Sequence, residues 1–177
     1  MGYWNSRGLR GSGFEQSINY TNEVYRQKGL GLIQKIPTPI TPIEIQKETG
    51  RISLAYFDSK STVDYIGIIQ GVAICFDAKE TREKSLPIHN IHEHQIEFMR
   101  DFKNQGGISF ILVHFKFFER YFYMPIDVLI KFWNRAQNGG RKSIRFDEFD
   151  KNYEIYPDKN NTIIHYIEAV AKEFSNI

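Results

Sequence analysis

The feature that most constrains the fold is a pair of short β-strand patterns joined by Gln70-Gly71. Residues 66–69 and 72–76 are rich in β-branched and aromatic side chains, and they flank a two-residue connection that ends in glycine. If Gln70 and Gly71 are the central residues of a tight turn, cross-strand partners are numbered symmetrically about them. The pattern therefore predicts a β-hairpin in which the neighbour and the face of every side chain are defined.

Extending this register places two acids opposite each other. Asp64 would lie across from Asp77 and Thr62 across from Lys79, with all four side chains on one face of the hairpin. The rest of that face is apolar and consists of Ile66, Ile68, Ala73 and Cys75. Two opposed carboxylates in such surroundings repel each other unless a cation lies between them.

A divalent cation between Asp64 and Asp77, with Lys79 facing the same substrate atom, is the layout of a metal-dependent nuclease. The alternative is that the two acids end their strands and form ion pairs with Lys79 and Lys60. The hairpin alone leaves both interpretations open.

Size and composition favour one domain over residues 1–177. Of the 177 residues, 41% are hydrophobic, which is enough for one sizeable core. The single cysteine, Cys75, excludes an intramolecular disulfide and suits a reducing compartment. The sequence has neither an apolar run of membrane-spanning length nor an N-terminal apolar signal core. We therefore expect a cytoplasmic protein without membrane contacts.

The rest of the chain alternates helical and strand patterns, which predicts an α/β fold with a mixed β-sheet flanked by helices. Residues 108–115 are apolar throughout, as in a buried central strand. Helices are predicted at 13–28, 90–103, 127–137 and 162–174, further strands at 32–36, 51–57 and 120–124, and a basic turn at 139–145.

Residues 37–52 are predicted to leave the core. Pro37, Pro39 and Pro42 exclude a helix and any central strand, and they favour a stiff extended segment. The segment is also longer than the usual connection between two elements. It is either a surface loop or an arm that enters a ligand.

Several short motifs occur in order over residues 5–144. They are Asn5-Ser6-Arg7-Gly8 with Glu15 and Ile18-Asn19, Lys35-Ile36-Pro37-Thr38-Pro39, Ala55-Tyr56-Phe57, Ser61-Thr62-Val63-Asp64-Tyr65-Ile66-Gly67, Phe76-Asp77-Ala78-Lys79-Glu80-Thr81, His92-Glu93-His94-Gln95, Phe132-Trp133 and Gly140-Arg141-Lys142-Ser143-Ile144. Each motif alone is weak, whereas the ordered set is specific. The set resembles the RecU Holliday junction resolvases, which have the restriction-endonuclease-like, PD-(D/E)xK nuclease fold.

The resemblance implies a Mg²⁺-dependent endonuclease that resolves four-way DNA junctions by symmetric strand cleavage in recombination and repair. It also implies a homodimer, a stalk at 37–52 that projects into the junction centre, and contact with the RecA recombinase. Lys79 would stabilise the charge of the transition state. The metal ligands of the family fall at Thr62, Asp64, Asp77 and Gln95.

Asp77 departs from the family pattern, which has glutamate here. Aspartate is one methylene shorter, so we expect an active site with a shifted metal or a preference for another divalent ion such as Mn²⁺. Two alternatives remain beside the resolvase: a non-catalytic junction-binding or RecA-modulating protein on the same scaffold, and a related nuclease for other branched or duplex DNA. Metal-dependent cleavage and a panel of substrates would separate the three.

Other polar residues have competing explanations. Gln95, on an otherwise apolar helical face, would be a costly buried amide unless it binds a metal or water. Glu15 lies where several nucleases of this fold carry a helical acid, but Ser12 and Glu15 also match a helix capping box. A zinc site at His92 and His94 is not expected, because no cysteine or third histidine has ligand spacing.

Basic residues are concentrated in the first part of the chain. Residues 1–145 carry 20 Lys and Arg against 14 Asp and Glu, whereas residues 146–177 carry 3 against 7. This distribution is compatible with binding a polyanion through part of the surface, although each basic side chain alone is more often simply solvated. The side chains expected to contact DNA phosphates are Arg7, Arg10, Lys35, Lys47, Arg51, Lys60, Arg141 and Lys142, with Arg145 beside them.

Overall fold

A six-stranded sheet in the order β1-β4-β5-β7-β8-β10 forms the centre of the molecule in the computed structural model. β5 and β7 are parallel, and the other neighbouring pairs of this sheet are antiparallel. The predicted mixed sheet is therefore confirmed. Its strands are β1 (Gly31–Lys35), β4 (Tyr65–Ile69), β5 (Val72–Thr81), β7 (Ile108–Phe115), β8 (Arg120–Pro125) and β10 (Glu154–Ile155).

The structure describes residues 13–57, 62–157 and 164–175. Arg7, Arg10 and Lys60, which were expected to contact DNA, lie outside the described residues, as do residues 5–8 of the first motif and Ser12 of the capping box. No helix within the described ranges is long and apolar enough to cross a membrane.

Helices cover both faces of the sheet. α1 (Gly13–Gln27) and α4 (Ile167–Phe174) pack on one face, against a cluster that includes the stacked rings of Tyr65, Phe76 and Phe110. α2 (Glu93–Asn104) and α3 (Ile126–Gln137) pack on the other, against a cluster that includes Cys75. All eight residues of β7 are buried, as expected for a central strand covered on both faces.

The hairpin β4–β5 has the predicted register. Tyr65 pairs with Phe76 and Ile69 with Val72, so Gln70 and Gly71 form the turn. Both turn residues have positive φ, 48° for Gln70 and 83° for Gly71, as a type I′ hairpin turn requires. The acid pair is thereby directed to the face covered by α2 and α3.

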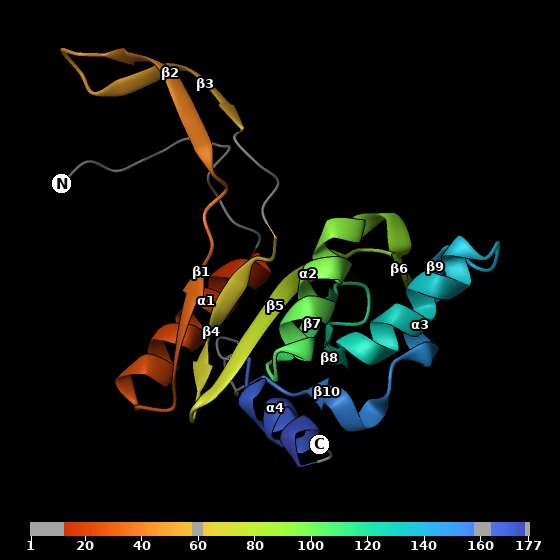
Figure 1. Cartoon of the computed structure of the whole chain (residues 1–177). Helices are drawn as coiled ribbons and strands as arrows, with labels where there is room; N and C mark the ends of the chain where they lie inside the picture. Colours follow the sequence, from red (N-terminus) through yellow and green to blue (C-terminus); the bar gives the residue numbers. More distant parts are fainter. Residues whose placement is uncertain (1–12, 58–61, 158–163, 176–177) are drawn as a thin grey trace.

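A second hairpin projects from the body of the molecule (Figure 1). β2 (Ile40–Gln46) and β3 (Arg51–Phe57) pair only with each other in the described structure, and we call this hairpin the arm. The expectation that the excursion ends at residue 52 and that 51–57 returns to the core was wrong. The reason is that β1 pairs directly with β4, so β3 does not lie between them and pairs with β2 instead. Pro42 is tolerated because both strands of a two-stranded sheet are edges.

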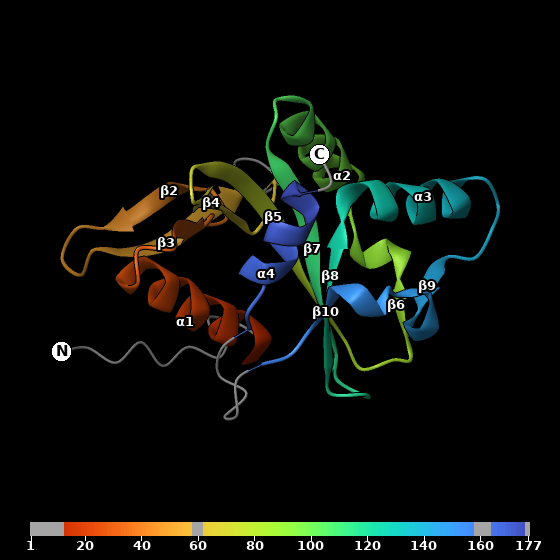
Figure 2. The same ribbon diagram turned by 90° about the horizontal axis from the view of Figure 1, so that it is seen from below.

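Two short strands, one between β5 and α2 and one after α3, pair to form a further small sheet. β6 (Ser85–Pro87) pairs with β9 (Ser143–Arg145), so the predicted basic turn partly forms a strand. Short 3₁₀ helices flank these strands: η1 (Ile88–Asn90), η2 (Phe146–Glu148) and η3 (Lys151–Tyr153). Figure 2 shows α1 and the arm at one end of the molecule and α3 with β9 at the other.

Two helices begin later than predicted. α2 begins at Glu93 instead of residue 90 because Ile91 and His92 are extended, with ψ of 128° and 146°. α4 begins at Ile167 instead of residue 162, and Ile164 forms an isolated bridge with Pro157 before it. In both cases the apolar pattern extends ahead of the helix because Ile91 and Ile164 are buried without being helical.

Candidate active site

The two acids predicted to face each other are held together by the hairpin. Asp64 precedes β4, and its backbone N–H donates a hydrogen bond of 3.1 Å to Asp77 Oδ1. The backbone N–H of Ala78 donates one of 3.0 Å to Asp64 Oδ2. Each carboxylate is therefore fixed by the backbone of the opposite strand, which confirms the predicted juxtaposition.

Asp77 is a completely buried carboxylate with an incompletely satisfied oxygen. Its side chain is 0% exposed, and its Oδ2 forms an ion pair with Lys79 Nζ. Within the described part of the chain, Oδ2 accepts no directed hydrogen bond. Lys79 offsets only one of the two negative charges of Asp64 and Asp77, so neutralising the pair calls for a further cation.

Gln95 connects the N-terminus of α2 to both catalytic candidates on β5. Its Nε2 donates to Asp77 Oδ1 at 3.1 Å, while its Oε1 accepts from Lys79 Nζ at 3.2 Å. Oε1 also accepts the backbone N–H of His92 at 3.1 Å, so Gln95 is the third helical residue of a capping box. The buried amide predicted to need a partner has three, and its oxygen is oriented by the helix cap.

The environment of the pair disfavours two negative charges. Burial, and next the charge of Asp77, raise the pKa of Asp64 to about 6, against the opposing effects of the Ala78 N–H and Lys79. The deprotonated pair is thus under electrostatic strain at neutral pH. A cation bound between the carboxylates would relieve that strain.

The donor set fits a hard divalent cation. The two carboxylates are ligands that Mg²⁺ prefers, whereas the amide oxygen of Gln95 accepts hydrogen bonds from Lys79 and His92 in this structure. Thr62 is half-buried two residues before Asp64, and among the described residues its hydroxyl makes no hydrogen bond to either acid. No group of three or more His, Cys, Asp and Glu side chains that could hold a metal occurs in the described ranges.

Two histidines lie at the N-terminus of α2. His92 is the N-cap residue of the helix, and its ring stacks on that of His94 with centroids 5.5 Å apart. His94 is half-buried, and His92 is exposed. The pair therefore forms a small stacked surface beside Gln95.

Glu15 forms an ion pair with Lys35, which links α1 to β1. The residue therefore has a structural partner on the opposite side of the sheet from α2. The role of Glu15 as a helical acid of the nuclease stays a prediction. The predicted capping box of Ser12 and Glu15 also stays a prediction, because Ser12 lies outside the described residues.

The described residues expected to bind DNA fall into separate regions. Lys47 and Arg51 lie at the tip of the arm, whereas Lys35 ends β1. Arg141 and Lys142 are exposed before β9, near the other end of the molecule (Figure 2). The backbone N–H groups of Ala78 and His92 were missed altogether, because no side-chain pattern marks a backbone donor.

Comparisons with known proteins agree with the motifs. The family model described as "RecU: Recombination protein U" matches residues 9–172. The "Holliday junction resolvase RecU" of Pediococcus pentosaceus is 37% identical over 174 residues, which cover 96% of this chain and 87% of that protein. The protein of the same name from Lactococcus lactis subsp. lactis is 42% identical over 169 residues, or 93% of this chain and 78% of that protein. A solved structure titled Archaeoglobus fulgidus Hjc, a Holliday junction resolvase, aligns at a TM-score of 0.40 with 10% identity, over 66% of this chain and 75% of that chain, which is too low to support an inference.

Proposed function

The chain belongs to the RecU family, and we propose that it is a Mg²⁺-dependent endonuclease that resolves four-way DNA junctions by paired strand cuts. In enzyme terms it would be a crossover junction endodeoxyribonuclease, a phosphodiester hydrolase of recombination and repair. The observation that carries the proposal is the buried Asp77 carboxylate, which faces a second acid and a lysine and has an oxygen without a directed hydrogen bond.

Asp64 and Asp77 would hold the metal, with Thr62 and Gln95 as the further ligands that the family pattern suggests. When bound, Mg²⁺ polarises a phosphate oxygen and lowers the pKa of a bound water, and Mn²⁺ could substitute for it. The carboxylates must be charged to bind it, and the pKa of Asp64 is about 6 in the metal-free protein. Metal affinity should therefore fall as the pH drops below about 6, because protons compete for Asp64.

Lys79 would provide the fixed positive charge of the site. Its Nζ lies between Asp77 Oδ2 and Gln95 Oε1, and only 13% of its side chain is exposed. Being part of β5, it is directed by the strand to the same face as the acids. An ammonium in this position can stabilise the charge that develops on the non-bridging phosphate oxygens. A non-catalytic binding protein would have no need to keep this constellation.

Two symmetric cuts require two sites, so we propose that the protein acts as a homodimer. The arm supports this proposal because both of its strands expose apolar side chains: Leu54 and Tyr56 alternate on one face of β3, and Ile45 pairs with Ile52 beyond a β-bulge. All four are between 46% and 57% exposed. Exposed apolar surface of this kind favours a protein contact, and a second copy of the arm would cover it.

The remaining expectations come from the family alone. We propose that the arm is the stalk that enters the junction, and that the protein contacts the RecA recombinase through residues not yet assigned. A role in chromosomal recombination would place it in the cytoplasm.

Replacement of the lysine, Lys79→Ala, tests the proposed function. We expect junction cleavage to fall by about 10²–10³-fold, while the Kd for a synthetic four-way junction stays within about twofold. Lys131→Ala is the matched control, since Lys131 is an exposed lysine of α3. This variant should cleave the junction as the unaltered protein does. Unchanged nicking by Lys79→Ala would overturn the assignment of the site.

A further inference from the structure

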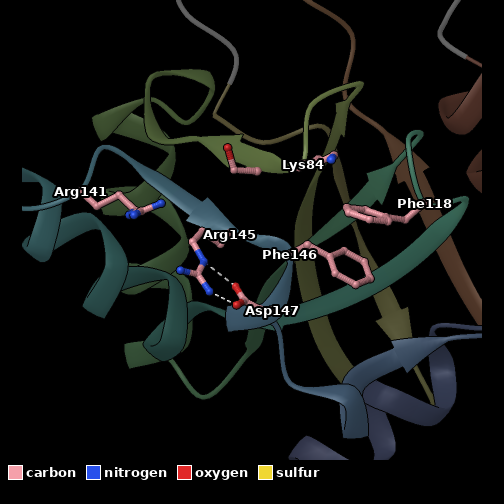
Figure 3. Close-up of a pocket in the computed structure, with 7 residues that line it drawn as sticks. Lys84, Phe118, Arg141, Arg145, Phe146 and Asp147 are labelled. Carbon is pink, nitrogen blue, oxygen red and sulfur yellow. Dashed lines mark hydrogen bonds and ion pairs between the residues drawn. The ribbon is translucent and has the colours of Figure 1, made fainter.

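A second group of cationic residues surrounds a surface pocket beside the small sheet β6–β9. The pocket has a volume of about 390 Å³. Figure 3 shows Arg141 and Arg145 on one side of it and the rings of Phe118 and Phe146 on the other. Its full lining is Lys84, Ser85, Phe118, Arg141, Arg145, Phe146 and Asp147.

Two of the three cations have no acidic partner. Within the described chain, Arg141 is exposed and forms no ion pair or hydrogen bond. Lys84 is also exposed, and its Nζ lies 4.8 Å from the centroid of the Phe117 ring, without an acid beside it. Arg145 differs, because its guanidinium is paired with the carboxylate of Asp147. Two unpaired cations at one concave surface are suited to an external anion.

Aromatic rings form the other wall. Phe118 and Phe146 lie with their centroids 4.0 Å apart, and Phe117, whose ring contacts Phe118, is 58% exposed. Cationic groups beside exposed aromatic rings are typical of surfaces that follow a nucleic-acid strand, where phosphates meet the cations and sugars or bases lie on the rings.

The pocket lies on the same side of the sheet as the acid pair. Phe118 and Phe146 pack against the core cluster that contains Cys75, which shares the face of β5 with Asp77. Lys84 follows Lys79 by five residues in the sequence. Five residues span at most about 18 Å, and a strand of duplex DNA advances about 3.4 Å per nucleotide, so the two lysines are within about five nucleotides of each other.

We propose that this pocket binds a backbone phosphate of a junction arm, within about five nucleotides of the phosphate that is cut. Arg141 and Lys84 would contact the phosphate, and the phenylalanine rings would support the adjoining sugar. This inference rests on the proposed function, and it assigns to the β6–β9 end a contact distinct from those of the acid pair and the arm.

The number of phosphate contacts can be measured from the salt dependence of binding. The probe is a fluorescein-labelled synthetic four-way junction in EDTA, titrated by fluorescence anisotropy at 50–200 mM NaCl. For the double variant Lys84→Ala/Arg141→Ala, we expect the slope of log K against log[NaCl] to become less negative by about 0.9, since the two side chains contact one phosphate and each phosphate contact contributes about 0.9. The matched control is Arg26→Ala/Lys28→Ala, which removes two exposed charges from the end of α1 and should leave the slope unchanged.

A gain of binding tests the same pocket without removing any cation. Asp147→Asn should release Arg145 and remove a negative charge from the pocket, so the slope should become more negative by up to about 0.9. Asp101→Asn is the control, because Asp101 is likewise an exposed acid beside an arginine, Arg100, but lies on α2 outside this pocket.

The outcomes separate the two proposals. Junction binding with the expected shifts in both variants supports the pocket. Junction binding by the unaltered protein with a slope that the Lys84/Arg141 double variant leaves unchanged would overturn the pocket and leave the nuclease assignment intact. Failure of the unaltered protein to bind the junction at all would overturn the proposed function, and the pocket with it.

Discussion

The two consecutive hairpins of this chain both place side chains in unfavourable surroundings, but the side chains differ. One hairpin holds carboxylates inside the protein, and the other exposes apolar side chains to solvent. The hairpin β4–β5 places two carboxylates inside the protein, where Asp77 is completely inaccessible and Asp64 is half-buried. The arm, β2–β3, exposes isoleucine, leucine and tyrosine to solvent, including Ile52 and Leu54. Neither arrangement favours the isolated subunit, because buried charge and exposed apolar surface both raise its free energy.

The difference indicates what each hairpin binds. Buried acids are stabilised by a cation, which fits a metal-dependent catalytic site. Exposed apolar side chains are stabilised by another protein surface, which fits assembly. Catalysis and assembly would thus be divided between two hairpins, one inside the main sheet and one outside it.

A charge on the apolar face of the arm should separate assembly from folding. We expect Leu54→Asp to convert the dimer to a monomer and to reduce paired cleavage by about 100-fold or more, because a buried unpaired charge in an interface is strongly unfavourable. The folding stability of the subunit should change by no more than about 0.5 kcal/mol, since Leu54 is 49% exposed. Sedimentation and junction cleavage measure the two effects.

Thr49→Asp is the control for the arm, because Thr49 is an exposed polar residue in the turn between β2 and β3. It should remain dimeric. If both variants stay dimeric and cut in pairs, the arm does not hold the dimer together.

Neutralising one acid of the catalytic hairpin should have a smaller effect than Leu54→Asp. The property that changes should be the folding stability. The folded pKa of Asp64, about 6, lies above its ordinary value of 3.8, so its charged form destabilises the folded state above pH 6. We expect Asp64→Asn to raise the free energy of unfolding of the metal-free protein by roughly 1–3 kcal/mol at pH 8. The gain should shrink as the pH falls through 6, where the native acid becomes protonated, and vanish near pH 4.

Denaturant unfolding in EDTA at several pH values tests this expectation. The control is Asp101→Asn, an exposed acid of α2. A gain that does not depend on pH would mean that the side-chain change acts through packing and that repulsion within the acid pair is not the cause.

The sequence was sufficient to predict the catalytic hairpin because its geometry is local. Gln70 and Gly71 set the register, and alternation then assigned Asp64, Asp77 and Lys79 to one face. The central strand at 108–115 was predictable for a similar reason, since a run of eight buried residues allows no other position in the sheet.

Features that depend on distant parts of the chain were not predictable. Residues 51–57 have a strand pattern, but only the direct pairing of β1 with β4 shows that they belong to the arm. The orientation of Gln95 depends on the backbone of His92, whose extended conformation delays the start of α2. The pocket beside β9 joins Lys84 to Arg141, which are distant in sequence and brought together only by the pairing of β6 with β9.

The most direct test of the account is cleavage of a labelled four-way junction in Mg²⁺ and in Mn²⁺ by the unaltered protein and by Asp77→Ala, with a linear duplex as the control substrate. We expect paired, symmetric cuts on the junction, none on the duplex, and a loss of at least about 10³-fold in the variant. Equal cleavage by Asp77→Ala, or tight junction binding by the unaltered protein with no cutting in either metal, would contradict the assignment of the buried acid pair as the catalytic site.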